Sequence, residues 1–158
     1  MSGNGKFIPG HEGVTLYPAF EGLGDQPIFL AAGLGGGCVE TGPFKNYTVN
    51  LGPIGLQGAA PGPEGGLGYN PRCLKRDVGP GVALKYTNWT AVAETIAEPT
   101  LADFQWRLQG KPGTGTIGPH GGGHFTIGGD PGGDVFISPS DPAFYLHHGQ
   151  IDRVWAIW

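Results

Sequence analysis

The segment Asp141-Pro-Ala-Phe-Tyr-Leu-His-His-Gly-Gln-Ile-Asp-Arg-Val-Trp155 is the most informative part of this sequence. Asp141 is a favoured residue at a helix N-cap, and Pro142 is favoured at the first helical position, so the segment predicts a helix. At 3.6 residues per turn, one apolar stripe of that helix contains Phe144, His148, Ile151, Trp155 and Trp158. We therefore expect His148 to face the core and His147 to point about 100° away from it.

A second pair of histidines lies upstream, in His120-Gly-Gly-Gly-His124. On a helix this spacing puts both imidazoles on one face, where they can share a metal ion. Each of the three glycines costs about 1 kcal/mol relative to alanine, so helix propensity alone predicts a loop. A glycine-rich turn with two exposed histidines is the alternative. If the segment is helical, its glycines leave room for a substrate beside the imidazoles.

Four of the five histidines thus fall between residues 120 and 148. Neutral imidazole is a common ligand of transition metals. A set of imidazoles without cysteine or clustered carboxylates favours copper or zinc over calcium or magnesium. The sequence therefore predicts a metal site.

The remaining sequence predicts one mainly α-helical domain with long loops. A chain of 158 residues buries roughly 70% of its unfolded surface, which is enough for a moderate core. Residues 1–80 are punctuated by glycine and proline, so we expect loops with short strands such as Tyr47–Leu51, whereas residues 81–158 are expected to be helical. Two more helices are predicted, Trp89–Ala97 with Asn88 or Thr87 as its cap, and Leu101–Gln109 with a Thr100/Asp103 capping box and Gly110 as its stop.

Charge and hydropathy exclude two classes of partner. The net charge of −4 provides no basic footprint for nucleic acid or for an anionic membrane surface. No stretch approaches the roughly 20 apolar residues of a membrane span. We therefore expect neither nucleic acid nor a membrane as a partner.

The cysteines and two glycosylation motifs favour a secretory route. Cys38 and Cys73 are the only cysteines, and Asn46-Tyr-Thr and Asn88-Trp-Thr are both N-glycosylation sequons. These features predict a secreted protein with a Cys38–Cys73 disulfide and with glycans on Asn46 and Asn88. The N-terminal residues 1–6 contain no apolar segment and are not a signal peptide. Because the C-terminus also stops inside an amphipathic pattern, we interpret both ends as cut.

The histidine segment resembles the copper B signature of tyrosinases and their relatives, the type 3 copper proteins. Three upstream segments are similar to stretches of secreted fungal members of this family, namely His120–Asp134, Gly42–Gly52 and Tyr69–Asp77. The resemblance therefore extends over most of the chain. It implies a four-helix core that holds two copper ions, each bound by three histidines. It also implies that dioxygen binds at these ions and that phenols or catechols are oxidised to quinones.

The resemblance assigns roles to individual residues. In the family pattern, copper B is bound by the His-x-x-x-His pair and the second histidine of the doublet, which here are His120, His124 and His148. His147 becomes a neighbouring packing residue. The remaining candidates lie beside the ligands: Asp152 orients a ligand imidazole or pairs with Arg153, Gly121 leaves the approach to the metal open, and Phe125 contacts an aromatic substrate or simply packs.

The sequence departs from the family in lacking the other copper site. Outside the cluster only His11 remains, in a Pro-Gly-His-Glu-Gly loop. We therefore interpret residues 1–158 as a partial copper-binding domain, the C-terminal half of a longer oxidase whose N-terminal copper A half is missing. Such a half holds one copper and is expected to be inactive alone, with the apolar stripe that includes Trp155 and Trp158 exposed.

Substrate preference and function have alternatives. Some relatives carry an acidic residue shortly before the first ligand that assists monophenol hydroxylation. The only acidic residue between Glu98 and His120 is Asp103, on a different predicted helix, which favours o-diphenol oxidation. A dioxygen-binding protein of the haemocyanin type is one rival interpretation. A non-enzymatic mononuclear domain, with zinc as the metal, is the other.

Overall fold

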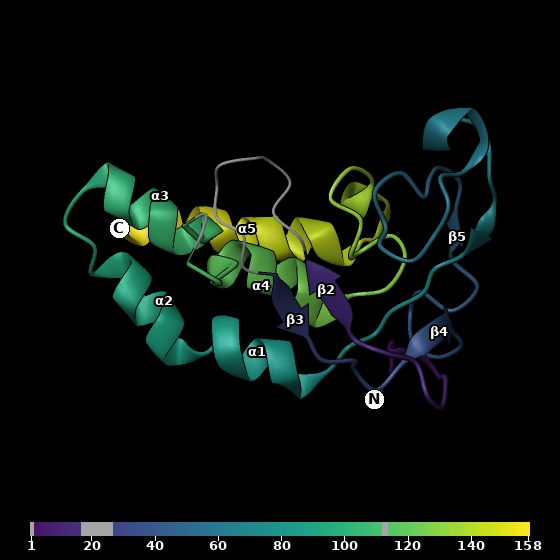
Figure 1. Ribbon diagram of the computed structural model, residues 1–158, viewed down its shortest axis with the longest axis horizontal. Helices are drawn as coiled ribbons and strands as arrows, with labels where there is room; N and C mark the ends of the chain where they lie inside the picture. The colour runs from purple at the N-terminus through teal and green to yellow at the C-terminus, as the bar shows by residue number, and fades with distance from the viewer. Residues whose placement is uncertain (1, 17–26, 112–113) are drawn as a thin grey trace.

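The computed structural model describes residues 2–16, 27–111 and 114–158. Five α-helices dominate the second half of the described chain, and short strands joined by long loops make up the first half (Figure 1). The helices are α1 Pro80–Tyr86, α2 Trp89–Ile96, α3 Leu101–Gln109, α4 Gly118–Ile127 and α5 Ala143–Ile157, with short 3-10 turns at Pro63–Gly66 and Ser138–Ser140. The mainly helical fold expected from the sequence is confirmed.

Three two-stranded antiparallel sheets organise the loop-rich half. The pairs are β1 Gly5–Phe7 with β4 Gly36–Val39, β2 Val14–Leu16 with β3 Ile28–Leu30, and β5 Thr48–Val49 with β6 Arg72–Cys73. The expected strand at Tyr47–Leu51 is thus shortened to two residues. The hairpin β2–β3 packs with Leu30 against Val82 and Tyr86 of α1, which joins the strand region to the helices.

The predicted caps set the boundaries of α2 and α3. The Asn88 side chain accepts a hydrogen bond from the Ala91 N–H at 2.9 Å, which selects Asn88 over Thr87 as the cap of α2. Thr100 accepts from the Asp103 N–H at 3.2 Å, and α3 ends at Gly110 with a φ of 85°. Helix α1 has no counterpart among the predicted helices. It begins with Pro80, whose fixed φ suits a first turn.

Helix α5 buries a face that differs in part from the one expected. Val154 is its buried residue and packs with Phe104 and Leu108 of α3. Trp155 and Trp158 are about 43% and 38% exposed, and both rings contact Phe104, at centroid distances of 5.3 and 4.6 Å. Both tryptophans are expected from the sequence to be exposed, but they are only partly exposed because each ring contacts Phe104 of α3.

A buried ion pair ties the strand region to the start of α5. The Arg76 guanidinium donates two hydrogen bonds to the Asp141 carboxylate, at 2.6 and 2.9 Å, and both residues are buried. The same carboxylate accepts from the N–H of Ala143, the first residue of α5, at 2.8 Å. The helix thus begins one residue later than expected, with Asp141 still serving its first turn. Removing either partner of the ion pair would leave an uncompensated buried charge.

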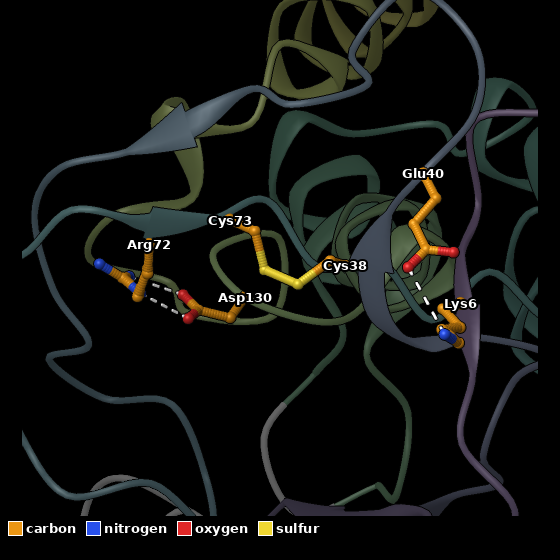
Figure 2. Close-up of a disulfide and its surroundings, with 6 residues drawn as sticks. All are labelled: Lys6, Cys38, Glu40, Arg72, Cys73 and Asp130. Carbon is orange, nitrogen blue, oxygen red and sulfur yellow. Dashed lines mark hydrogen bonds and ion pairs between the residues drawn. A yellow bond between two sulfur atoms is a disulfide. The ribbon is translucent and has the colours of Figure 1, made fainter.

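Cys38 and Cys73 form the predicted disulfide, with a Cα–Cα distance of 5.6 Å. Figure 2 shows it between β4 and β6, beside the Arg72–Asp130 ion pair. None of the helices in the described ranges is both long enough and apolar enough to cross a membrane.

The disulfide supports a stability prediction. The two cysteines are 35 residues apart, and closing a loop of this length stabilises a fold by roughly 3–4 kcal/mol in the chain-entropy model. We expect the double variant Cys38→Ser/Cys73→Ser to lose about that much free energy of unfolding, measured by urea titration of the intact protein. Thiol titration of the unfolded wild type is the control and should detect no free thiol from this pair. Two reactive thiols would contradict the prediction.

Candidate metal centre

Helices α4 and α5 bring four histidines into one cluster. One ligating nitrogen from each of His120, His124, His147 and His148 lies within 4.8 Å of the others. The first two residues come from α4 and the last two from α5, and in Figure 1 these helices run side by side through the centre of the molecule. The fold thus assembles the predicted metal site from two consecutive α-helices.

The segment His120–His124 is helical, so the loop expected from its glycine content is wrong. Close packing explains why glycines occupy this helix. A Cβ at Gly122 would lie 2.4 Å from the Cβ of Tyr86 on α1, and a Cβ at Gly123 would lie 2.1 Å from the His147 ring. Helix α4 also contacts α2 and α3. Because glycine has no side chain, neighbouring helices pack closely against α4, and this packing outweighs the weak helix propensity of glycine.

Three of the imidazoles point their Nε2 atoms at one another. The Nε2 atom of His124 lies 3.3 Å from that of His120 and 3.2 Å from that of His148. Three ring nitrogens that converge at this spacing can act together as ligands of one ion. The donor set therefore fits a histidine-ligated transition metal.

The fourth imidazole makes a different contact. The Nε2 atom of His147 lies 2.9 Å from the backbone carbonyl oxygen of His120 and donates a proton to it. The His147 ring also stacks on the His120 ring, with a centroid distance of 5.5 Å. His147 thereby fastens α5 to α4, in the space that Gly123 leaves open.

Two contacts that sequence reasoning missed orient the cluster. The Nδ1–H of His120 donates to the side-chain oxygen of Gln109 at the end of α3, which directs the unprotonated Nε2 inward. Phe144 stacks on His148, with ring centroids 4.0 Å apart. The i, i+4 spacing of Phe144 and His148 is a signal for the second contact, whereas the sequence contains no signal for the first.

Burial favours the neutral form of three of the four imidazoles. Desolvation, followed by repulsion from neighbouring histidines, lowers the pKa of His120 and of His124 from 6.5 to about 4. Burial also lowers the pKa of His147. Neutral imidazole is the form that binds a metal, and the lowered pKa values of these three residues favour that form at pH 7.

These shifts predict an acid sensitivity of the metal-free protein. Between pH 6.5 and about 4 the unfolded chain binds protons at His120 and His124 that the folded chain does not bind. The contribution of these two residues to the free energy of unfolding should therefore fall as the pH decreases through this window and level off below it. Urea unfolding at several pH values measures this slope. The matched control is His120→Gln/His124→Gln, which should have a smaller slope; an equal slope would contradict the assignment to these two residues.

The other predicted site residues, Gly121, Phe125 and Asp152, are not among the four residues of the histidine cluster. Gly121 is half-buried and packs against Ile117. Phe125 packs against the Leu30, Val82 and Tyr86 cluster, which corresponds to its packing alternative. Asp152 is exposed, and among the described residues it forms no hydrogen bond or ion pair with a histidine or with Arg153.

The fifth histidine belongs to a separate structural contact. The two ring nitrogens of His11 face the Ile8 carbonyl at 2.7 Å and the Asp77 carboxylate at 2.9 Å. The hydrogen bond to Ile8 is the main cause that raises the pKa of His11, and Asp77 adds to it. The Asp77 carboxylate also accepts from the N–H groups of Gly33 and Gly35, so this contact holds a glycine-rich loop.

A helical core that presents converging imidazoles from two central helices defines a histidine-ligated metalloprotein. Residues 1–158 match the family model described as the common central domain of tyrosinase, and the chain belongs to this family. The resemblance to tyrosinases inferred from the histidine segment is therefore confirmed.

Individual relatives agree with the family assignment. The protein named Tyrosinase P from Aspergillus terreus is 40% identical over 161 residues, which cover 100% of this chain and 44% of that protein. A protein named N-acetyl-6-hydroxytryptophan oxidase from Emericella nidulans is 44% identical over 135 residues, which cover 82% and 37% of the two chains. A solved structure of a polyphenol oxidase mutant from Thermothelomyces thermophila has a TM-score of 0.89 and 55% identity, and the match covers 99% of this chain and 40% of that one. This chain thus spans less than half the length of these relatives.

Proposed function

We propose that this chain is the copper B region of a longer oxidase that converts o-diphenols to o-quinones with dioxygen. The convergence of the Nε2 atoms of His120, His124 and His148 is the observation that carries the proposal. The family membership and the names of the relatives, which include a tyrosinase and a polyphenol oxidase, support it. The longer protein supplies the copper A half, consistent with the greater length of the relatives.

The proposed ligands are the three imidazoles with inward-facing Nε2 atoms. Gln109 supports His120 as a ligand, because its side-chain oxygen accepts a hydrogen bond from the Nδ1–H of His120 and this leaves Nε2 without a proton. His147 is a positioning residue in this scheme, because its Nε2–H donates a hydrogen bond to the His120 carbonyl oxygen. When two copper ions are bound in the whole protein, they supply the redox chemistry that passes two electrons from the diol to dioxygen.

The chain's own residues favour diphenol over monophenol chemistry. A monophenol must be deprotonated, which calls for a base beside the metal. Asp103 is exposed and serves the cap of α3, where its carboxylate accepts from the Thr100 hydroxyl at 2.6 Å. The residue of α3 that contacts His120 is Gln109, whose amide is neutral. Neither residue provides a base beside the cluster, which supports o-diphenol oxidation as the proposed reaction.

We also propose that the protein follows the secretory route. The Cys38–Cys73 disulfide supports this, because such bonds persist in oxidising compartments. The two sequons add to it. The proposed partners are therefore an extracellular phenolic substrate and dioxygen.

The proposal is tested on the full-length protein loaded with copper. We expect catechol oxidation that saturates with substrate and is lost after copper removal or zinc replacement. Reversible dioxygen binding without catechol turnover would favour the haemocyanin-type alternative. Tight binding of a single zinc ion with no copper-dependent activity would favour the mononuclear alternative.

A further inference from the structure

The two sequons, which are equivalent as sequence motifs, occupy different structural environments. Asn46 is exposed in a turn closed by hydrogen bonds from Lys45 N–H to Gly42 and from Tyr47 N–H to Phe44, at 3.2 and 3.1 Å. Its φ of 63° is in the left-handed region, which asparagine tolerates better than most residues. Within the described residues its side chain makes no hydrogen bond. The amide of Asn46 is therefore accessible for a substituent.

The amide of Asn88 is already engaged on both sides. Its oxygen accepts from the Ala91 N–H at 2.9 Å, and its nitrogen donates to the Leu84 carbonyl at 2.7 Å. The side chain thus joins the end of α1 to the start of α2. A sugar on this nitrogen would replace one of its two N–H groups and lie beside the Leu84 carbonyl, which would disturb this cap.

An aromatic surface lies beside Asn46. Phe44 and Tyr47 belong to the same turn, with their rings edge to face and 6.1 Å between centroids. The Arg76 guanidinium lies 5.1 Å from the Phe44 ring, whereas Tyr47 is 40% exposed. The C–H groups of a sugar ring pack favourably on such an exposed aromatic ring.

We propose that Asn46, and not Asn88, carries an N-linked glycan whose first N-acetylglucosamine packs on Tyr47. This proposal rests on the secretory route proposed above. The donor is a lipid-linked oligosaccharyl pyrophosphate. The bond between Asn46 Nδ2 and sugar C1 forms as the bond from C1 to the pyrophosphate oxygen breaks; Nδ2 loses a proton, and the lipid pyrophosphate leaves.

The position of this glycan is compatible with the metal centre. The turn precedes β5, which pairs with β6 through Thr48 and Cys73. Figure 1 shows β5 at the end of the molecule opposite the C-terminus of α5. The glycan would therefore cover the disulfide-bonded end of the fold and leave the histidine cluster open.

Site occupancy is tested on the full-length protein secreted from yeast with a host leader peptide. Thr48→Val and Thr90→Val each remove one sequon and leave both asparagines in place. We expect peptide:N-glycosidase to release one glycan fewer from Thr48→Val than from the wild type, and the same number from Thr90→Val as from the wild type. Mass spectrometry of the wild type should locate the glycan on Asn46. A glycan on Asn88, or a bare Asn46 in the secreted protein, overturns the proposal. Catechol turnover of the same samples judges the proposed function separately.

The contact with Tyr47 has its own measurement. Trimming the glycan to its first sugar should leave the Tm unchanged, whereas complete removal should lower it by about 1–2 °C. Because complete enzymatic removal leaves aspartate, Asn46→Asp is the matched control for the added charge. Tyr47→Ala should abolish the difference between trimmed and fully deglycosylated protein. A difference that persists in Tyr47→Ala would refute the packing.

Discussion

In the proposed full-length oxidase, His148→Ala is expected to remove one of the two copper ions. Structural zinc sites bind with about 10–16 kcal/mol shared among four ligands, and on that scale the loss of one ligand lowers the affinity by at least about 100-fold. The inward-facing Nε2 atom of His148 is the reason for this expectation. Copper content after dialysis and chelator competition measure the loss.

His147→Ala is the matched comparison on the adjacent residue. It removes the donor to the His120 carbonyl, so we expect an affinity loss of about 10-fold with the copper content retained at saturation. His147→Gln keeps a side-chain N–H donor and should restore part of the loss. Equal losses in His147→Ala and His148→Ala, or a loss confined to His147→Ala, would show that the ligand assignment is wrong.

The isolated 158-residue chain is expected to bind at most about one tight copper ion and to lack catechol oxidase activity above that of free copper. Three histidines hold a single copper ion, and one copper(I) ion supplies only one of the two electrons that the coupled reaction delivers to dioxygen. Metal analysis and a catechol assay on the same sample test both statements. Enzymatic turnover by the monomeric chain would contradict the proposed half-site.

Exposed apolar residues give the isolated chain a second expected property. On α5, Tyr145, Leu146 and Ile157 are 66%, 78% and 56% exposed, and Trp89 on α2 is 82% exposed. Apolar surface of this kind promotes association, so we expect the chain to aggregate. Light scattering measures this. Co-expression with the upstream segment of the proposed longer oxidase should restore a monodisperse protein with two copper ions and turnover.

Local sequence signals were sufficient for some elements. The caps at Asn88 and Thr100 and the stop at Gly110 predict α2 and α3 to within one residue, because cap chemistry is local. The helical period also places Phe144 and His148 on one face of α5, but it does not predict that His147 faces α4 and joins the same cluster. These predictions needed only neighbours within one or two turns.

Other features depend on contacts between distant segments. The glycines of α4 predict a loop, because nothing near them in the sequence reveals that Tyr86 and His147 pack against the helix. The contact between Gln109 and His120 is likewise formed only after α3 and α4 dock. The predicted stripe of α5 leaves out Val154, because the sequence does not reveal that α3 packs beside that residue.

The buried Arg76–Asp141 pair has a consequence for recombination between relatives. A crossover near residue 80 would look natural, since strands and loops precede it and helices follow. Such a chimera would combine an arginine from one parent with an aspartate from another, and with them the start of the helix that carries His147 and His148. Such a chimera is therefore expected to fold only where one parent supplies the arginine, the other supplies the aspartate, and the two side chains keep the same distance.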